Sequence, residues 1–489
     1  MAAEAILAAL REVIDPELGI NIVDLGLVDE VEETEWGIRV RLGMTTPACP
    51  AGPLMRSQAR SALLSLPEVE EAEVLPARDF RWSTDRMSNA AREQLASSGA
   101  AAPADGLAEP PGPAPRPGEG GPGSESDGPA GQPSRSGLAW QRLPLLAAGI
   151  LSLVAASWGG LLRLGWPWPI PEPAWVGAHG PLMVCGFLGT LIGVERAVGL
   201  EQRWAYAGPV ATALGAIGLL AALPTRFAAS LMTLGSLILV AIFVNLLRRE
   251  RELATATLGV GALCWLAGNL LWLSGSPLPQ LVPWWMAFLV LTIGGERLEL
   301  SRVLSPPTGA MLAFGASALT VLAGCALTSL QSAWGAQVLG LGFLGLTAWL
   351  ARHDVARRTL SQPGLTRFVA LCLLSGYGWL AVSGLLGLGF GSPGAGPIYD
   401  ALLHALFVGF VLSMVFGHAP IIFPSVLNRP LVFRRAFYVH VGLLHASLVL
   451  RLAGDLAGVS ELRLCGGLLN AAALGLFLIN TVRSVQLRS

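Results

Sequence analysis

A series of apolar runs, each close to the length needed to cross a bilayer, constrains this chain more than any other feature. From residue 138 onward we count about twelve runs of roughly 20 residues. They begin near Leu138, Trp175, Trp204, Phe227, Leu253, Trp284, Gly309, Trp334, Phe368, Ile398, Ala436 and Leu462. With 53% apolar and 13% charged residues, the chain lacks the polar surface that a soluble protein of this size needs. The sequence therefore predicts an all-α polytopic membrane domain over residues 138–489.

Arginines occur in every second segment that connects these runs. They cluster before the first run, after every second run and at the end of the chain, whereas WPWPIPEP, SGSPLPQ and SPGAGP hold none. Because arginine-rich connections stay on the cytoplasmic side, both termini are expected in the cytoplasm. The first 40 residues are acidic and amphipathic, so we expect no signal peptide. These features indicate a multi-pass protein of the bacterial inner membrane.

The chain ahead of the apolar runs divides into two parts. Residues 1–95 predict a small α/β domain with helices over 2–13, 53–66 and 84–95, and strands over 26–33, 37–44 and 69–75. This part carries 17 acidic residues against 9 arginines, which argues against nucleic-acid binding. Residues 96–137 consist mostly of Ala, Pro, Gly and Ser, a composition typical of a flexible linker.

Cys49 is the candidate chemical residue of the N-terminal part. It lies in the turn TTPACPAGP, just ahead of the helix expected over 53–66. Backbone N–H groups and the helix dipole at such a position stabilise a thiolate, which can bind iron or a cluster transiently. One cysteine cannot complete a site, so a homodimer, a partner protein, or Asp15, Glu17 or Asp24 would have to contribute. The alternative is a buried structural cysteine in a loop.

Three segments carry a family resemblance for this part. The stretches DPELGINIVDLGLV, MTTPACPAGPLM and RWSTDRMSNAAREQL occur in that order. Together they resemble the metal–sulfur cluster assembly family that includes SufT and PaaD, over about the first 95 residues. The resemblance implies a role in iron–sulfur cluster assembly, with client or carrier proteins as partners, and places the family's signature cysteine at Cys49.

Histidines are the candidate ligands of the membrane part. Five of them lie within or beside the apolar runs: His179, His404, His418, His440 and His445. Ionisable groups inside a membrane cost free energy, so their presence there indicates a function. We expect His179 and His404 to form an outer level. We expect His418 with either His440 or His445 to form an inner level. In a regular α-helix His404 and His418 share a face, about 21 Å apart. Imidazoles without an acidic cage suit haem iron or copper, and the alternative is hydrogen bonding between helices.

A weak internal repeat links three of the runs. CGFLGTLIGVERAVGL resembles FLVLTIGGERLELSR, and HGPLMVCGFLGT resembles HALFVGFVLSM. The first match aligns Glu195-Arg196 with Glu296-Arg297, and we expect these residues to form intramembrane ion pairs that brace the bundle. Chance similarity between Leu- and Gly-rich helices is the alternative.

The histidine-containing segments HALFVGFVLSMVFGHAPIIFPSVLNRP and FYVHVGLLHASLVLRLAGDL resemble the NnrS-type family of membrane proteins. That resemblance implies haem or copper binding and a link to nitric oxide, with His179, His404, His418 and His440 as ligands. The segment GHAPIIFP departs from the family pattern, which leaves the number and identity of the ligands open.

Three functions remain open from the sequence. The first is a haem- or copper-binding membrane protein with an iron–sulfur assembly module, linked to metal-centre maturation or nitric oxide stress. The second is a small-solute or proton-coupled transporter with a regulatory N-terminal domain. The third is a membrane anchor for that domain alone. The chain shows no nucleotide-binding loop, catalytic triad, HExxH or EF-hand pattern, so we expect an assembly or binding factor rather than a classical enzyme.

Overall fold

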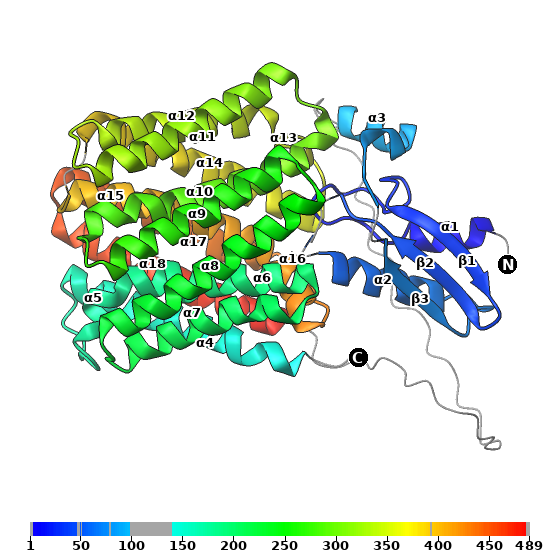
Figure 1. Ribbon diagram of the computed structural model, residues 1–489, viewed down its shortest axis with the longest axis horizontal. Helices are drawn as coiled ribbons and strands as arrows, with labels where there is room; N and C mark the ends of the chain where they lie inside the picture. Colours follow the sequence, from blue (N-terminus) through cyan, green and yellow to red (C-terminus); the bar gives the residue numbers. More distant parts are fainter. Residues whose placement is uncertain are drawn as a thin grey trace.

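The computed structural model describes residues 3–45, 49, 51–77, 80–97, 139–391 and 394–485. A helical bundle, which comprises the described residues from 139 onward, carries a small α/β domain at one end (Figure 1). We call that end of the bundle the docking end and the opposite end the far end. The expected linker over 96–137 lies almost entirely outside the described residues.

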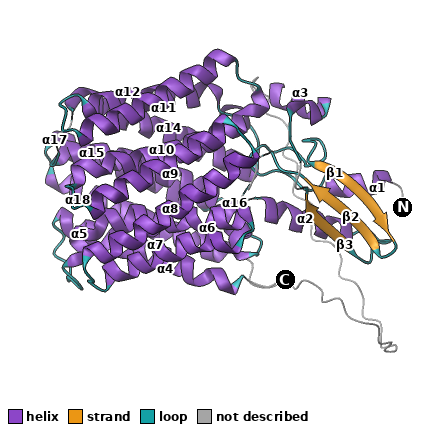
Figure 2. Ribbon diagram, in the orientation of Figure 1, coloured by secondary structure: helices purple, strands orange, loops and turns teal. Residues whose placement is uncertain are grey.

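The N-terminal domain is built on a three-stranded sheet of order β1-β2-β3, with its helices beside it (Figure 2). β1 (Val28–Thr34) pairs with β2 (Gly37–Leu42) in antiparallel fashion, and β2 pairs with β3 (Ala72–Pro76) in parallel. A parallel pair needs a crossover, which α2 (Gly52–Leu64) provides. The remaining helices are α1 (Ala3–Leu10), the 3₁₀ turn η1 (Thr84–Arg86) and α3 (Asn89–Ser97).

Alternation along β2 explains which face of the sheet is buried. Ile38, Val40 and Leu42 are at most 2% exposed, whereas the intervening arginines reach Glu32, Glu73 and Glu30. Trp82, from the third segment of the family resemblance, is buried and donates from Nε1 to the carbonyl of Leu25 at 2.8 Å. The small α/β fold expected for this part is therefore present.

The bundle consists of long helices with short connections. Its elements are α4 (Leu143–Leu164), α5 (Ala174–Pro181), η3 (Leu182–Gly189), α6 (Thr190–Leu200), α7 (Ala207–Leu220), α8 (Thr225–Arg249), α9 (Leu253–Leu273), α10 (Leu278–Ser301), α11 (Thr308–Ser329), α12 (Gly335–His353), α13 (Ala356–Thr359), α14 (Gly364–Phe390), α15 (Pro397–His404), η6 (Ala405–Val411), α16 (Leu412–Leu427), α17 (Phe437–Ala457) and α18 (Ser460–Ser484). Short 3₁₀ turns are η2 (Trp140–Arg142), η4 (Arg203–Tyr206) and η5 (Arg302–Leu304).

Ten helices among the described residues are long and apolar enough to cross a membrane. The outer surface agrees with this, since large apolar side chains such as Leu312, Leu319 and Val482 are 67–70% exposed. The expected count of about twelve spans is not confirmed. α7 and α12 occupy the positions of the other two runs, but α7 has only 14 residues and α12 ends in Arg352 and His353.

Two of the bundle's helices contain π-helical segments. η3 follows His179 within the α5–α6 helix, and η6 follows His404 within the α15–α16 helix. Pro181 lacks a backbone N–H and stands immediately before η3, which favours the irregular turn there. Such segments often mark functional sites, because they change the face on which later residues lie.

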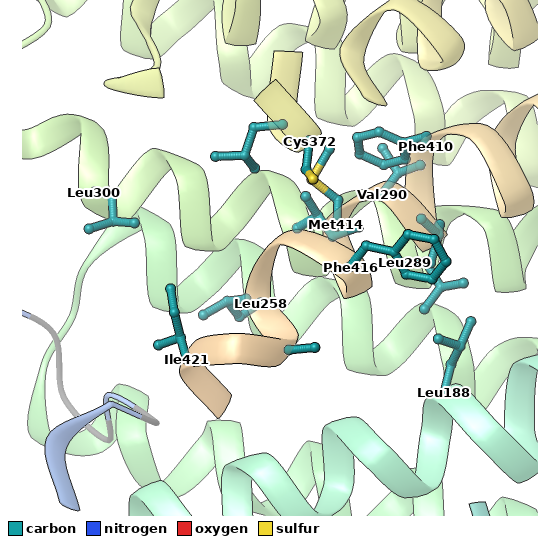
Figure 3. Close-up of a cluster of buried hydrophobic side chains, with 14 of the residues drawn as sticks. Leu188, Leu258, Leu289, Val290, Leu300, Cys372, Phe410, Met414, Phe416 and Ile421 are labelled. Carbon is teal, nitrogen blue, oxygen red and sulfur yellow. The ribbon is translucent and has the colours of Figure 1, made fainter. Parts of the chain in front are cut away.

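A cluster of buried apolar side chains lies inside the bundle (Figure 3). Leu188, Leu289, Val290, Phe410, Met414 and Phe416 meet there from η3, α10, η6 and α16. These residues belong to the three helices that the internal repeat had linked.

Candidate functional site

The contact between the N-terminal domain and the docking end begins with Asp15. Its carboxylate Oδ1 accepts backbone N–H groups of Glu17 at 2.9 Å and Leu18 at 3.0 Å, which fixes a tight turn after α1. Asp15 is only 6% exposed. Burial, with repulsion from Glu17, raises the pKa of Asp15 to about 6, although the two backbone hydrogen bonds and Arg297 partly oppose the increase.

Glu17 projects from this turn into the bundle. Its Oε1 lies 2.7 Å from Arg297 Nη2 of α10 and 3.1 Å from His418 Nε2 of α16. Burial by itself would raise the pKa of Glu17, but Arg297 and the hydrogen bond from His418 outweigh it and lower the pKa to about 2. Glu17 is therefore a carboxylate at neutral pH, and it connects the N-terminal domain with two helices of the bundle.

His418 keeps hydrogen-bond partners in either protonation state. Its Nδ1 lies 2.8 Å from the carbonyl of Met414, and its Nε2 lies 3.1 Å from both Glu17 Oε1 and Arg297 Nη2. With Nδ1 donating to Met414, a neutral ring accepts from Arg297, and a charged ring donates to Glu17. The His418 ring can thus take up or release a proton and still keep a hydrogen bond at each of its nitrogens.

A second charged group lies beside this contact at the ends of α6 and α10. Arg196 Nη2 lies 3.2 Å from Glu195 and also pairs with Glu296. Glu195 and Arg196 are at most 6% exposed. The sequence analysis expected ion pairs among Glu195, Arg196, Glu296 and Arg297; Arg196 pairs with both glutamates, whereas Arg297 pairs with Glu17 of the N-terminal domain.

Cys49 lies at the same interface. It is half-buried, and its carbonyl accepts the backbone N–H of Gly52, where α2 begins. Arg56 in α2 forms an ion pair with Glu201 at the end of α6, and Arg196 interacts electrostatically with Cys49. Cys49 therefore precedes a helix, as expected, and lies near a guanidinium group of the bundle. Asp24, in contrast, accepts a 2.6 Å hydrogen bond from Asn21 and has a structural role within its own domain.

The far end contains the other predicted pair. The rings of His179 and His404 stack with centroids 6.4 Å apart and planes 19° apart. His179 Nδ1 lies 2.6 Å from the carbonyl of Ala156, and His404 Nδ1 lies 2.8 Å from that of Asp400. Each Nδ1 thus donates to a carbonyl, and each Nε2 keeps a lone pair, the arrangement seen in metal-binding histidines.

Both histidines line a cavity of about 420 Å³ at the far end. Its wall is largely apolar, with Met183, Phe187, Trp285 and Phe407 among the lining residues. The polar lining residues include Arg163, Tyr399, Asp400, Arg451, Arg463 and Asn470. Sequence reasoning missed Asp400 and Arg451, which form a bidentate ion pair. Nε and Nη2 of Arg451 lie 2.9–3.1 Å from the carboxylate oxygens of Asp400. Arg451 within an apolar run was the available signal.

The expected inner level of histidines does not form. His440 is fully buried among Phe368, Phe416, Phe437 and Phe477, with ring centroids 4.9–6.3 Å away. His445 accepts a hydrogen bond from Trp379 at 2.9 Å. His418 contacts Glu17 and Arg297 instead of either ring. The π-helix η6 lies between His404 and His418, so the spacing argument from a regular α-helix fails. Across the described ranges, no three His, Cys, Asp or Glu side chains are grouped to hold a metal ion.

Comparison with known proteins assigns the two parts to different families. Residues 3–74 match the family described as "Iron-sulfur cluster assembly protein", and residues 142–486 match the family described as "Domain of unknown function (DUF8744)". The match of the membrane part does not show the expected NnrS-type family.

Individual relatives cover the N-terminal part. The chain is 40% identical over 93 residues to "Fe-S protein maturation auxiliary factor YitW" of Bacillus subtilis, covering 19% of this chain and 91% of the relative. It is 40% identical over 84 residues to "Fe-S protein maturation auxiliary factor SufT" of Staphylococcus aureus, covering 17% of this chain and 96% of the relative. A crystal structure of a "Domain of Unknown Function DUF59" from Bacillus anthracis is 38% identical and covers 19% of this chain and 90% of that one, with a TM-score of 0.19.

Proposed function

This chain belongs to the iron–sulfur cluster assembly family through its N-terminal domain and to the family described as "Domain of unknown function (DUF8744)" through residues 142–486, and we propose that it is a membrane-bound iron–sulfur maturation factor. In this proposal the N-terminal domain holds a cluster transiently at Cys49 and passes it to client or carrier proteins. It is an assembly factor rather than a classical enzyme. The bundle fixes the domain at the membrane and contributes a second, metal-binding site.

The observation that most supports the proposal is that Glu17 is hydrogen-bonded to Arg297 and His418 inside the bundle. A domain that is merely tethered needs no such buried ion pair, because a flexible linker alone would keep it at the membrane. This contact and the Arg56–Glu201 pair hold the Cys49-bearing face against α6, α10 and α16. The relatives named as maturation factors supply the chemical role of the domain.

The surroundings of Cys49 suit a transient ligand. Backbone N–H groups at the start of α2 and the charge of Arg196 both favour a thiolate. The remaining ligands would come from the client, or from a second copy in a homodimer. Reconstitution of the detergent-purified protein with iron and sulfide, beside Cys49→Ser, tests this role. Loss of the cluster absorbance in the variant is expected, and equal absorbance in both proteins would refute it.

The proposed location is the bacterial inner membrane, with the bundle in the lipid bilayer and both termini in the cytoplasm. Ten apolar helices support a multi-pass protein, and the distribution of arginines supports the orientation. The docking end would then face the cytoplasm, where clusters are assembled. Labelling of single cysteines introduced in connecting segments would test the orientation.

Haem or copper at the far end is the finer part of the proposal. His179 and His404 fit either group, since each Nδ1 bonds to a backbone carbonyl and each ring lines the cavity. The apolar wall suits a haem macrocycle, and Arg163 lines the same cavity as a partner for its carboxylates. When bound, such a metal supplies one-electron chemistry and a target for nitric oxide, which would link the protein to nitrosative stress.

An optical spectrum and metal analysis of the purified full-length protein test this part. We expect a haem absorbance or stoichiometric copper that His404→Ala removes and His353→Ala leaves in place, since His353 lies outside the cavity lining. A metal-free spectrum would refute the metal site and leave Cys49 as the chemical site.

A transporter is the second candidate, and the two π-helical segments favour it. η3 and η6 locally widen the turn of two helices that line the cavity, and such π-helical segments often lie at functional sites. Uptake of a small solute into liposomes, with and without a proton gradient, discriminates this function from metal binding. Uptake that is lost in His404→Ala while no metal is bound would favour the transporter.

A further inference from the structure

We propose that the bundle and a client protein compete for one face of the N-terminal domain, so that the domain must leave the docking end to deliver a cluster. This inference rests on the proposed role of Cys49. The face comprises Asp15, Glu17, Cys49 and Arg56, and we call it the docking face. The partner that fits it is a protein with an arginine or lysine beside its cluster-binding cysteines.

The position of Cys49 supports the competition. Arg56, seven residues after Cys49, is bonded to Glu201 of the bundle, and α2 packs against α16. Elsewhere in the interface, Thr366 donates to the carbonyl of Pro16 at 3.1 Å, and Arg358 donates to the carbonyl of Leu95 at 2.9 Å. Half-buried Cys49 therefore belongs to a domain that contacts the bundle through Arg56, Pro16 and Leu95, and the docked bundle would obstruct a folded client that approaches it.

The charge of the docking face indicates what replaces the bundle. Glu17 lies against a guanidinium that is 2% exposed, and the Nε and Nη1 atoms of Arg297 are buried without partners in the described structure. Once undocked, Asp15 and Glu17 lose this cation, and Glu17 presents an unpaired carboxylate on the docking face. A client with a basic group at its cluster site would restore the lost pairing, because charge complementarity steers such encounters.

The relatives give independent support. The chain covers 91% and 96% of two maturation factors while matching only 93 and 84 of its own residues. Those proteins therefore consist of little more than the N-terminal domain, and their sequences are too short to contain a bundle as well. A domain of this family whose docking face is covered by a fused bundle therefore needs a release step that the short relatives do not.

Thiol labelling of the full chain tests the inference. The background variant is Cys465→Ser, because Cys465 is exposed and the other cysteines of the bundle are buried. The probe is a maleimide joined to a bulky polyethylene glycol, and the rate of Cys49 labelling is measured in detergent. Glu17→Arg places two cations together at the interface, which we expect to raise this rate by at least about tenfold. Glu68→Gln, on an exposed residue outside the docking face, is the matched control and should leave the rate unchanged.

Charge exchange distinguishes undocking from misfolding. Glu17→Arg combined with Arg297→Glu should return the labelling rate to that of the background variant. If that buried exchange fails to fold, Arg56→Glu with Glu201→Arg provides the same comparison at an exposed pair. Equal labelling in the background and Glu17→Arg proteins would overturn the inference.

Cluster transfer to an apo-ferredoxin tests the client half. Reconstituted Glu201→Arg protein, in which a second cation faces Arg56 while Glu17 stays available to the client, should label faster at Cys49 and transfer its cluster faster than the background protein. Faster labelling without faster transfer would overturn the competition. Failure of the proposed function looks different, since then no variant would hold a cluster at Cys49 although labelling still responds to Glu17→Arg.

Discussion

Replacing Asp15 by asparagine should stabilise the protein at pH 7.5, an unusual direction for a buried residue. Asp15 is 6% exposed, and its pKa is raised to about 6 from an ordinary value of 3.8. A raised pKa means that the folded chain prefers protonated Asp15 over the ionised form. The stability that this preference contributes is fully present below pH 3.8 and is lost as the pH rises through 6. The difference corresponds to about 3 kcal/mol, which the ionised Asp15 costs at pH 7.5.

Asparagine avoids this cost while its Oδ1 still accepts the N–H groups of Glu17 and Leu18. We therefore expect Asp15→Asn to raise the free energy of opening of residues 3–27 at pH 7.5 by up to about 3 kcal/mol, which slows their hydrogen exchange. Between pH 7.5 and 5 the wild-type chain should gain about 1.4 kcal/mol from this group, and the variant should gain none of it.

Hydrogen exchange followed by mass spectrometry of the full-length protein in detergent measures both effects. When the infrared spectrum of Asp15→Asn is subtracted from that of the wild-type protein, a carboxyl band should remain that titrates with a midpoint near pH 6. Asp24→Asn is the matched control, since Asp24 bonds to Asn21 within the domain, and it should leave that band in place. Faster exchange in Asp15→Asn at pH 7.5, or a midpoint near pH 4, would refute the reasoning.

Three further predictions follow from buried contacts. Trp82→Phe leaves the buried carbonyl of Leu25 without its donor and should lower the free energy of unfolding of the N-terminal domain by about 1–3 kcal/mol, measured by denaturant titration; an unchanged midpoint would contradict the hydrogen bond. Gly409→Ala places a Cβ 2.4 Å from Trp379 and should lower the melting temperature in detergent, whereas Gly378→Ala on α14 meets no atom within 4 Å and should have little effect; equal melting temperatures would argue against close packing of η6 on α14. His440→Phe places an aromatic ring among four others and should leave any metal content unchanged, while the same change at His404 should remove it; metal loss in His440→Phe would restore that residue as a ligand.

The sequence by itself determined the features that depend on local pattern. Apolar runs of membrane-spanning length predicted the helical bundle, because each run must bury its own backbone polar groups in a helix. Alternation of Ile38, Val40 and Leu42 predicted a half-buried strand. The motif around Cys49 predicted both its place ahead of α2 and the assembly family, which the comparisons confirm.

Only the tertiary structure decided which distant residues meet. Glu17 and His418 are 401 positions apart, and no spacing in the sequence indicates that one contacts the other. The inner level of histidines failed for a related reason, since the π-helix η6 changes the turn angle that the spacing of His404 and His418 assumed. Local patterns report how each segment buries its own surface, whereas the docking of one domain on another depends on complementary charges that become neighbours only after folding.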